Sequence, residues 1–137
     1  MQAYDSDVLD AFVLRCALSE AFDVNDPRFA STMEAIDREL LVDDLVYRYR
    51  IDDIMEGDGA TFAACAFWHV GCLAMRGKFD EAQSLFDRLP ARGNDLGLFG
   101  EEIDAATGEH RGNFPQGFTH MAIINHALRV DRKSLQY

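Results

Sequence analysis

The chain has 137 residues, of which 48% are hydrophobic and 11% aromatic, a composition typical of one folded domain with a buried core. Its 24 acidic side chains outnumber the 13 basic ones and give a formal net charge of −11. Because this charge opposes binding to polyanionic nucleic acid or to an anionic membrane surface, we expect neither among its partners.

Targeting and metal-binding signals are absent from the sequence. There is no run of about 18 apolar residues, and the stretch from Met1 to Asp7 is acidic, so we expect neither a membrane-spanning helix nor a signal peptide, and a cytoplasmic location. His69 and His126 lack ligand partners at short spacing, so we expect no metal and no cofactor. The cysteines lie in apolar helical patterns and are predicted to be buried thiols: Cys16, Cys65 and Cys72.

The N-terminal part predicts two helices of different character. Residues 8–21 are apolar on nearly every side apart from Arg15, which predicts a helix covered on both faces. Asn25-Asp26-Pro27 then supplies an N-cap and a proline at the first helical position. Apolar residues follow at helical spacing and predict an amphipathic helix with one face in water: Phe29, Met33, Ile36 and Leu40.

The middle of the chain repeats this alternation. Residues 43–51 form a short β-branched and aromatic run, followed by a polar loop over residues 52–59. Residues 61–75 predict a second helix that is apolar all round, with Gly77 as its C-terminal cap. Asp80 is predicted to cap a second amphipathic helix. That helix ends near Pro90 and Gly93, and its apolar stripe contains Phe79, Ala82, Leu85, Phe86 and Leu89.

The last helix is predicted to open after Pro115, and the tail over residues 131–137 is polar and is expected to fray. The apolar members of this helix include Phe118, Met121, Ala122, Ile124, Ala127 and Leu128.

An internal repeat relates the two amphipathic segments. FASTMEAIDR at 29–38 resembles FDEAQSLFDR at 79–88, and DDL at 43–45 resembles NDL at 94–96, an offset of about 50 residues that indicates stacked supersecondary units. Each unit would hold a buried helix, an amphipathic helix and a loop. The repeat therefore predicts an all-α fold of about two and a half such units, arranged as part of a two-layered helical toroid.

The loop between the last two helices contains two adjacent carboxylates, Glu101 and Glu102. In a toroid of repeated units, the loops after the outer helices open at the same end, so Arg48 and Tyr49 are expected on the same rim, a natural place for a ligand. Composition and spacing alone favour a bland interpretation, in which the acidic pair is only solvated and residues 47–49 form a local stacking cluster.

Several motifs in this order resemble the C-terminal part of glycoside hydrolase family 15, and the resemblance runs from about Leu9 to Val130. This family contains glucoamylases, glucodextranases and bacterial trehalases on an (α/α)6 barrel, so the resemblance implies a single partial barrel of this type over residues 1–137. The matching segments are DDLVYRY at 43–49, CAFW at 65–68, GKFDEA at 77–82, NDLGL at 94–98, EEID at 101–104, TGE at 107–109 and GNFPQGFTH at 112–120.

The resemblance also implies roles for individual residues. Glu101 matches the general base of the family's Ser-Glu-Glu-Tyr-Asp motif and would activate a water for inverting hydrolysis. Arg48 and Tyr49 resemble a clamp for sugar hydroxyls, a task that suits a planar guanidinium. Glu102 and His120 would complete the substrate-binding set, although a hydrogen-bonded core histidine is an equally good interpretation of His120. Trp68 is predicted to be core.

Three departures from the family pattern limit the inference. The family's general acid lies in a Trp-Glu motif in the earlier half of the barrel, and here Trp68 is followed by His69. The first half of the barrel and the preceding β-sandwich are also absent from the sequence. In addition, Gly100 stands where the family often has Ser or Ala, and residues 55–59 read MEGDG rather than Gly-Gly-Glu-Gly.

Two functional hypotheses remain open on the sequence alone, beside the possibility that the reading frame is truncated and the chain is unstable by itself. The first is the C-terminal portion of an inverting α-glucoside hydrolase, which supplies the general base and part of the sugar site but lacks the acid. Such a portion would bind an α-glucoside and would need the N-terminal half of the barrel, or self-association, to cover its apolar face. The second is a non-catalytic helical-repeat module that binds carbohydrate or protein.

Overall fold

The computed structural model describes residues 5–50 and 60–131, and within these ranges the chain is mostly helical. The helices are α1 Phe12–Leu18, α2 Pro27–Glu39, α3 Ala63–Met75, α4 Phe79–Arg88, the short 3-10 helix η1 Leu89–Arg92, and α5 Gly117–Asp131. The strands have two residues each: β1 Leu41–Val42, β2 Leu45–Val46, β3 Thr61–Phe62, β4 Glu102–Ile103 and β5 His110–Arg111. The all-α prediction is therefore right for the scaffold but missed the small sheets, β1-β2 and β3-β4-β5.

The first helix is shorter than the predicted range of residues 8–21. At its start, the Ala11 N–H donates to the carbonyl oxygen of Arg48 at 2.7 Å, and the Phe12 N–H donates to the Asp10 carboxylate at 2.8 Å. At its end, the Ser19 hydroxyl donates to carbonyls of the last turn, and Glu20 adopts a left-handed φ of 60°. Side-chain and long-range partners thus replace the helical hydrogen bonds at both ends.

The second helix matches its prediction. The Asp26 carboxylate caps it by accepting the Arg28 N–H at 2.8 Å, and Pro27 occupies the first helical position. The apolar stripe is buried, with Phe29, Met33 and Ile36 facing the core.

The strand-like run after α2 forms a hairpin that begins two residues earlier than predicted. Leu41 pairs with Val46 across a turn in which Asp43 and Asp44 have φ values of 46° and 71°, as a two-residue hairpin turn requires. Arg88 of α4 donates to the Asp44 carboxylate at 2.9 Å through two nitrogens. The hairpin of one repeat is therefore fixed to the amphipathic helix of the next.

The helix α3 is the centre of the fold, as its uniform apolar sequence predicts. Residues 63–74 are all buried, including Cys65, Cys72 and Trp68. Burial raises the pKa of the Cys65 thiol above its usual range and that of Cys72 to about 12. Beyond its end, Gly77 has φ 77° and the Lys78 N–H donates to the Leu73 carbonyl at 2.9 Å. This glycine-terminated pattern confirms the predicted cap.

The predicted cap of α4 is wrong by two positions. The helix begins at Phe79, so that Asp80 lies in its first turn, and Lys78 occupies the N-cap position without a side-chain hydrogen bond. A carboxylate in the first turn still stabilises the helix through its dipole. Pro90 lies within η1 rather than beyond the helical segment.

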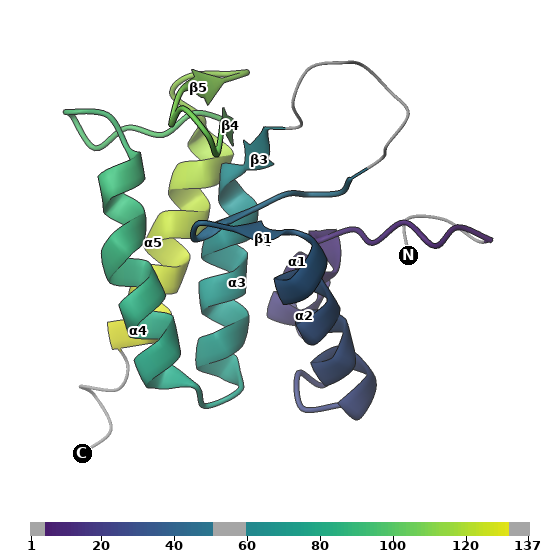
Figure 1. Ribbon diagram of the computed structural model, residues 1–137. Coiled ribbons are helices and arrows are strands. Elements are labelled where there is room, and N and C mark those ends of the chain that lie inside the picture. The colour runs from purple at the N-terminus through teal and green to yellow at the C-terminus, as the bar shows by residue number, and fades with distance from the viewer. Residues whose placement is uncertain (1–4, 51–59, 132–137) are drawn as a thin grey trace.

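The helices form two groups around α3 (Figure 1), with α4 and α5 on one side and α1 and α2 on the other. Packing contacts join α3 to α1, α4 and α5. The helix α5 begins at Gly117, two residues after Pro115, and one of its faces is uncovered. The large apolar side chains on that face are exposed: Phe118, Met121, Ile124 and Leu128.

Parts of two predictions fall outside the described residues. These are the polar loop over residues 52–59 and, apart from Asp131 at the end of α5, the polar tail over residues 131–137. In residues 5–50 and 60–131, none of the helices has the length and apolar character needed to cross a membrane.

Candidate active site

The acidic loop is held over the N-terminal ends of α3 and α5 by the small sheet β3-β4-β5 (Figure 1). Phe62 of β3 pairs with Glu102 of β4, and Glu102 in turn pairs with Arg111 of β5. The Ala63 N–H, at the start of α3, donates to the backbone carbonyl of Glu101 at 3.0 Å. The backbone that carries the two carboxylates is therefore hydrogen-bonded to β3 and α3 on one side and to β5 on the other. A flexible solvated loop would lack this pairing.

One oxygen of the Glu101 side chain is anchored, and the other is available. Oε2 accepts the Asn113 side-chain amide at 2.7 Å and its backbone N–H at 3.2 Å. Within the described residues, Oε1 accepts no hydrogen bond. Gly112 allows this approach, because a Cβ there would lie 3.0 Å from Oε2 and its φ is 71°. The side chain is half-buried, and the Asn113 hydrogen bonds fix its orientation while the other oxygen remains free to accept a hydrogen bond.

Gly100, which departs from the family pattern, is fixed through its backbone. Its N–H donates to Nδ1 of His110 at 3.0 Å, and its carbonyl accepts the Thr119 hydroxyl at 3.1 Å. A Cβ at this position would lie 3.2 Å from the His110 ring, so Ala or Ser would force the histidine to move slightly. The residue before Glu101 is therefore suited to its neighbour His110.

Glu102 has a perturbed acidity. Partial burial raises the pKa of its carboxyl group, and the adjacent Glu101 carboxylate raises it further, against the opposing charge of Arg111. The two glutamates therefore differ: Glu101 has an anchored carboxylate with one free oxygen, whereas Glu102 has a carboxyl group with a raised pKa.

An ion pair within the acidic loop was missed by the sequence interpretation. Asp104 accepts Arg111 Nη2 at 2.6 Å, and its other oxygen accepts the backbone N–H groups of Ala106 and Thr107 at 2.9 Å each. These hydrogen bonds and the Arg111 charge lower the pKa of the Asp104 carboxyl. The signal was present in the sequence, because Asp followed three residues later by Thr-Gly favours such a side-chain-to-backbone turn.

His120 lies beneath the loop. Its Nδ1 is 2.8 Å from the Gln116 carbonyl, and its Nε2 is 3.4 Å from the Phe99 N–H. A neutral ring protonated on Nδ1 satisfies both contacts, because that tautomer donates through Nδ1 and accepts through Nε2. Both ring nitrogens are thus directed at the backbone that carries the loop, which places His120 as a support of the site.

Arg48 and Tyr49 lie beyond β2, and Arg48 contacts Phe12 at the start of α1. The Arg48 guanidinium is 3.4 Å from the Asp10 carboxylate and lies over the rings of Phe12 and Tyr49, 5.5 and 5.8 Å from their centroids. Tyr49 is 41% exposed. The local stacking cluster considered from the sequence is therefore present only in part: Arg48 contacts the Tyr49 ring, whereas the Arg50 guanidinium lies over the Tyr47 ring, 4.4 Å from the ring centroid. Both Arg48 and Tyr49 remain at the surface.

A row of aromatic rings lies between this cluster and the acidic loop. Trp68 is at its centre, with ring centroids 5.8 Å from Phe12, 6.0 Å from Phe62 and 5.6 Å from Phe118. Since Phe12 contacts Arg48, and Phe62 is the strand partner of Glu102, the row joins the two groups of predicted site residues. Trp68 is core, as predicted, and its ring also connects Phe12, on the Arg48 side of the row, with Phe62, on the side of the acidic loop.

Comparison with known proteins identifies the family. A sequence model described as "Glycosyl hydrolases family 15" matches residues 1–128. The chain belongs to glycosyl hydrolase family 15. The resemblance inferred from the motifs is therefore confirmed. No solved structure matches the chain significantly.

Relatives that bear the name trehalase are similar over nearly the whole chain. The protein of Mycolicibacterium smegmatis is 43% identical over 96% of this chain, and that of Mycobacterium tuberculosis is 42% identical over 96%. The protein of Thermoplasma acidophilum is 36% identical over 99% of the chain. The chain spans only 20%, 20% and 24% of the length of these relatives.

Proposed function

We propose that this family 15 chain is the C-terminal portion, roughly half, of an (α/α)6 catalytic barrel that hydrolyses an α-glucoside with inversion, and that its substrate is trehalose. The anchored Glu101 carboxylate carries the proposal, supported by family membership and by the trehalase names of its relatives. The alternation of inner helices α1, α3 and α5 with outer helices α2 and α4 supports the barrel.

Glu101 acts as the general base. With Oε2 held by Asn113, Oε1 takes a proton from a water molecule that attacks the anomeric carbon on the face opposite the leaving sugar. The anomeric C–O bond breaks as the new one forms, so an α-glucoside yields β-glucose. The adjacent Glu102, with its raised pKa, donates a hydrogen bond to substrate when protonated.

The remaining binding residues serve the sugar hydroxyl groups. Arg48 presents guanidinium donors and Tyr49 a phenol at the surface beside α1, and both functions suit polyhydroxyl ligands. His120 contributes by fixing the backbone of Phe99 and Gln116. Its role in substrate binding is therefore indirect.

The general acid comes from outside these 137 residues. Inverting hydrolysis needs a second carboxyl group about 6.5–9.5 Å from the base, across a gap that holds the water. The chain has no Trp-Glu pair of the kind that the family uses. Catalysis therefore belongs to the longer assembly, in which an N-terminal part of the barrel supplies the acid.

A chimaera tests this proposal. The 137 residues replace the matching 134-residue segment of the Mycolicibacterium smegmatis trehalase, and glucose release from trehalose is measured for the parent chimaera and for Glu101→Gln. General-base catalysis contributes about 100- to 10,000-fold, so we expect kcat to fall within this range while the thermal midpoint changes little. Glu109→Gln, an exposed carboxylate of the same loop, is the matched control and should retain normal turnover.

The alternative function, a binding module without catalysis, has its own outcome in this experiment. A folded chimaera that binds trehalose in calorimetry but releases no glucose would favour the module over the hydrolase. Equal turnover in Glu101→Gln and Glu109→Gln would contradict the assignment of the base.

A further inference from the structure

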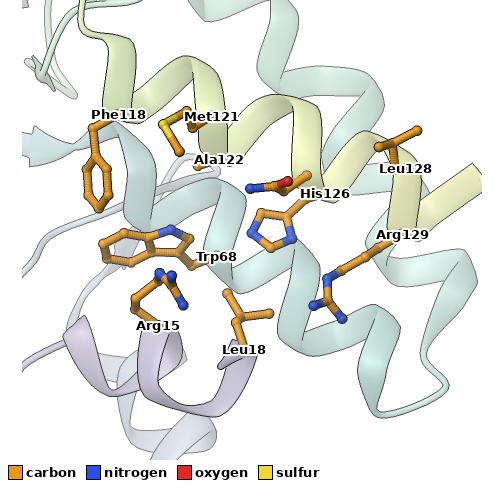
Figure 2. Close-up of a pocket in the computed structure, with 10 residues that line it drawn as sticks. Arg15, Leu18, Trp68, Phe118, Met121, Ala122, His126, Leu128 and Arg129 are labelled. Carbon is orange, nitrogen blue, oxygen red and sulfur yellow. The ribbon is translucent and has the colours of Figure 1, made fainter. Parts of the chain in front are cut away.

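A pocket of about 350 Å³ lies between α1 and α5, with Trp68 of α3 among its lining residues. Figure 2 shows Arg15 and Leu18 on one side and the α5 side chains on the other. The full set of lining residues is Arg15, Leu18, Trp68, Phe118, Met121, Ala122, Asn125, His126, Leu128 and Arg129. None of the residues proposed above for catalysis or sugar binding lines this pocket.

The pocket is cationic in a strongly acidic chain. Arg15 of α1 and Arg129 of α5 both line it, and no aspartate or glutamate does. Among the residues that the structure describes, neither guanidinium takes part in an ion pair, a property they share with Arg50, Arg76 and Arg92. What distinguishes Arg15 and Arg129 is that both line one pocket without an acidic residue, in a chain with a net charge of −11, and this favours an anionic occupant.

A buried histidine lies between the two arginines (Figure 2). His126 is 4% exposed, and its Nδ1 has no hydrogen-bond partner within the described part of the chain. The ring rests on Gly71 of α3, where a Cβ would come too close to Nδ1. Burial, together with the charges of Arg129 and Arg15, lowers the pKa of His126 to about 4. An anion in the pocket would oppose this charge effect and raise that pKa.

The border of the pocket is apolar and helical in spacing. Met121, Ile124 and Leu128 are exposed by 61%, 60% and 62%, and their spacing of three and four residues makes one stripe along α5. Large apolar side chains exposed in a stripe are typical of a face that packs against another helix. A cationic centre with an apolar border therefore fits a protein surface better than it fits a free small anion.

We propose that this face of α1 and α5 docks against the part of the longer protein that lies outside these 137 residues, which inserts an aspartate or glutamate side chain between Arg15 and Arg129. The proposal rests on the proposed function only in treating the chain as a portion of a longer family member. It is supported by the complementary charge and by the length of the relatives, of which the chain spans 20% in the Mycolicibacterium smegmatis protein.

Two features explain how such a carboxylate would be held. Arginine donors in a fork can bind both oxygens of a carboxylate, and His126 becomes a further donor when the pKa of its ring rises. Burial of a charge without a partner is strongly unfavourable. Each arginine would therefore matter more in the docked state than in the isolated chain, where water hydrates it.

Association in the absence of substrate tests the proposal. The chain is co-expressed with the Mycolicibacterium smegmatis trehalase from which the 134-residue matching segment has been removed, and the dissociation constant is measured after purification. We expect Arg15→Gln and Arg129→Gln each to weaken association at least about tenfold, since truncation of one member of a buried charge pair raises the off-rate. Arg38→Gln, at an exposed pair on α2, is the matched control. The relative's own excised segment shows that the upstream part is competent to bind.

The outcomes separate this inference from the proposed function. Association that is unchanged in both pocket variants overturns the docking proposal and leaves the role of Glu101 intact. If the parent chain does not associate although the relative's own segment binds, the result counts against both the docking proposal and the proposed function. A rise in the His126 pKa or in Tm with acetate or inorganic phosphate alone, lost in Arg129→Gln, assigns a small-anion site and overturns docking. Self-association of the chain that is lost in Arg129→Gln assigns the face to a second copy and likewise overturns docking against the longer protein.

Discussion

Substitution of Gly71 by alanine tests how tightly the buried helix α3 is packed beneath the pocket. In an ordinary helix interior this change stabilises, because glycine costs about 1 kcal/mol relative to alanine. Here a Cβ would lie 2.3 Å from Nδ1 of His126, 2.5 Å from its Cε1 and 2.8 Å from a methyl group of Leu18. All three distances are shorter than a Cβ tolerates, so the ring of His126 must move.

The two effects oppose each other, and the clash is expected to dominate. Insertion of a methyl group into a well-packed core costs typically about 1–3 kcal/mol, and His126 is 4% exposed. Set against the gain of about 1 kcal/mol in helix propensity, the free energy of unfolding should fall by up to about 2 kcal/mol. In a His126→Ala background the principal clash is gone, so the same Gly71→Ala change should be neutral or stabilising.

Urea denaturation followed by circular dichroism measures the four members of this double-mutant cycle. Gly117→Ala is the matched control, because a Cβ at the first position of α5 meets nothing within 4 Å; it should be neutral or slightly stabilising. Stabilisation by Gly71→Ala in the original background would refute the packing of His126 on Gly71. An equal effect in both backgrounds would show that the ring is not the obstacle.

Three further predictions concern titration and reactivity. The pKa of His126 is lowered from 6.5 to about 4, so the free energy of unfolding should fall by up to about 3 kcal/mol as pH falls through that window. In urea denaturation at stepped pH, His126→Asn should flatten this dependence of stability on pH. An unchanged dependence would assign the effect to another group. The backbone hydrogen bonds from Thr107 and Ala106, with the Arg111 charge, lower the folded pKa of Asp104, which therefore contributes stability present above its unfolded pKa near 3.8 and lost on further acidification. Its carboxyl carbon should titrate below the usual range by NMR, and an ordinary value would contradict these hydrogen bonds and the Arg111 pair. The buried thiols of Cys65 and Cys72, with raised pKa values, should react with a thiol reagent only after unfolding; fast modification of the native chain would oppose their burial.

The scaffold was largely predictable because its signals are local. The N-cap and proline at Asp26-Pro27, the all-round apolar pattern of residues 63–74 and the glycine cap at Gly77 each have a cause within a few residues of sequence. The length of α1 was not predictable in this way. It is set in part by the hydrogen bond from Ala11 to the carbonyl of Arg48, a partner far along the chain.

The candidate site residues were predicted from family motifs, but the contacts that hold them were not. Family motifs singled out Glu101, yet the anchoring of its Oε2 depends on Asn113, which comes close only because β4 and β5 pair. The cationic pocket could not be predicted from the sequence. Arg15 and Arg129 are far apart along the chain, and their helices α1 and α5 come together by packing on α3. Arg15 stood out only as an exception in an apolar helix.

The most direct test of the central claim is chemical rescue of the general base. In the chimaera, Glu101→Ala removes the carboxylate and leaves a small space beside Asn113, and α-glucosyl fluoride with added azide replaces trehalose and the activated water. If Glu101 is the base of an inverting reaction, turnover should be low without azide, rise with azide concentration, and yield β-glucosyl azide by NMR. Turnover near that of the unsubstituted chimaera without azide, or an α-configured azide product, would contradict the assignment.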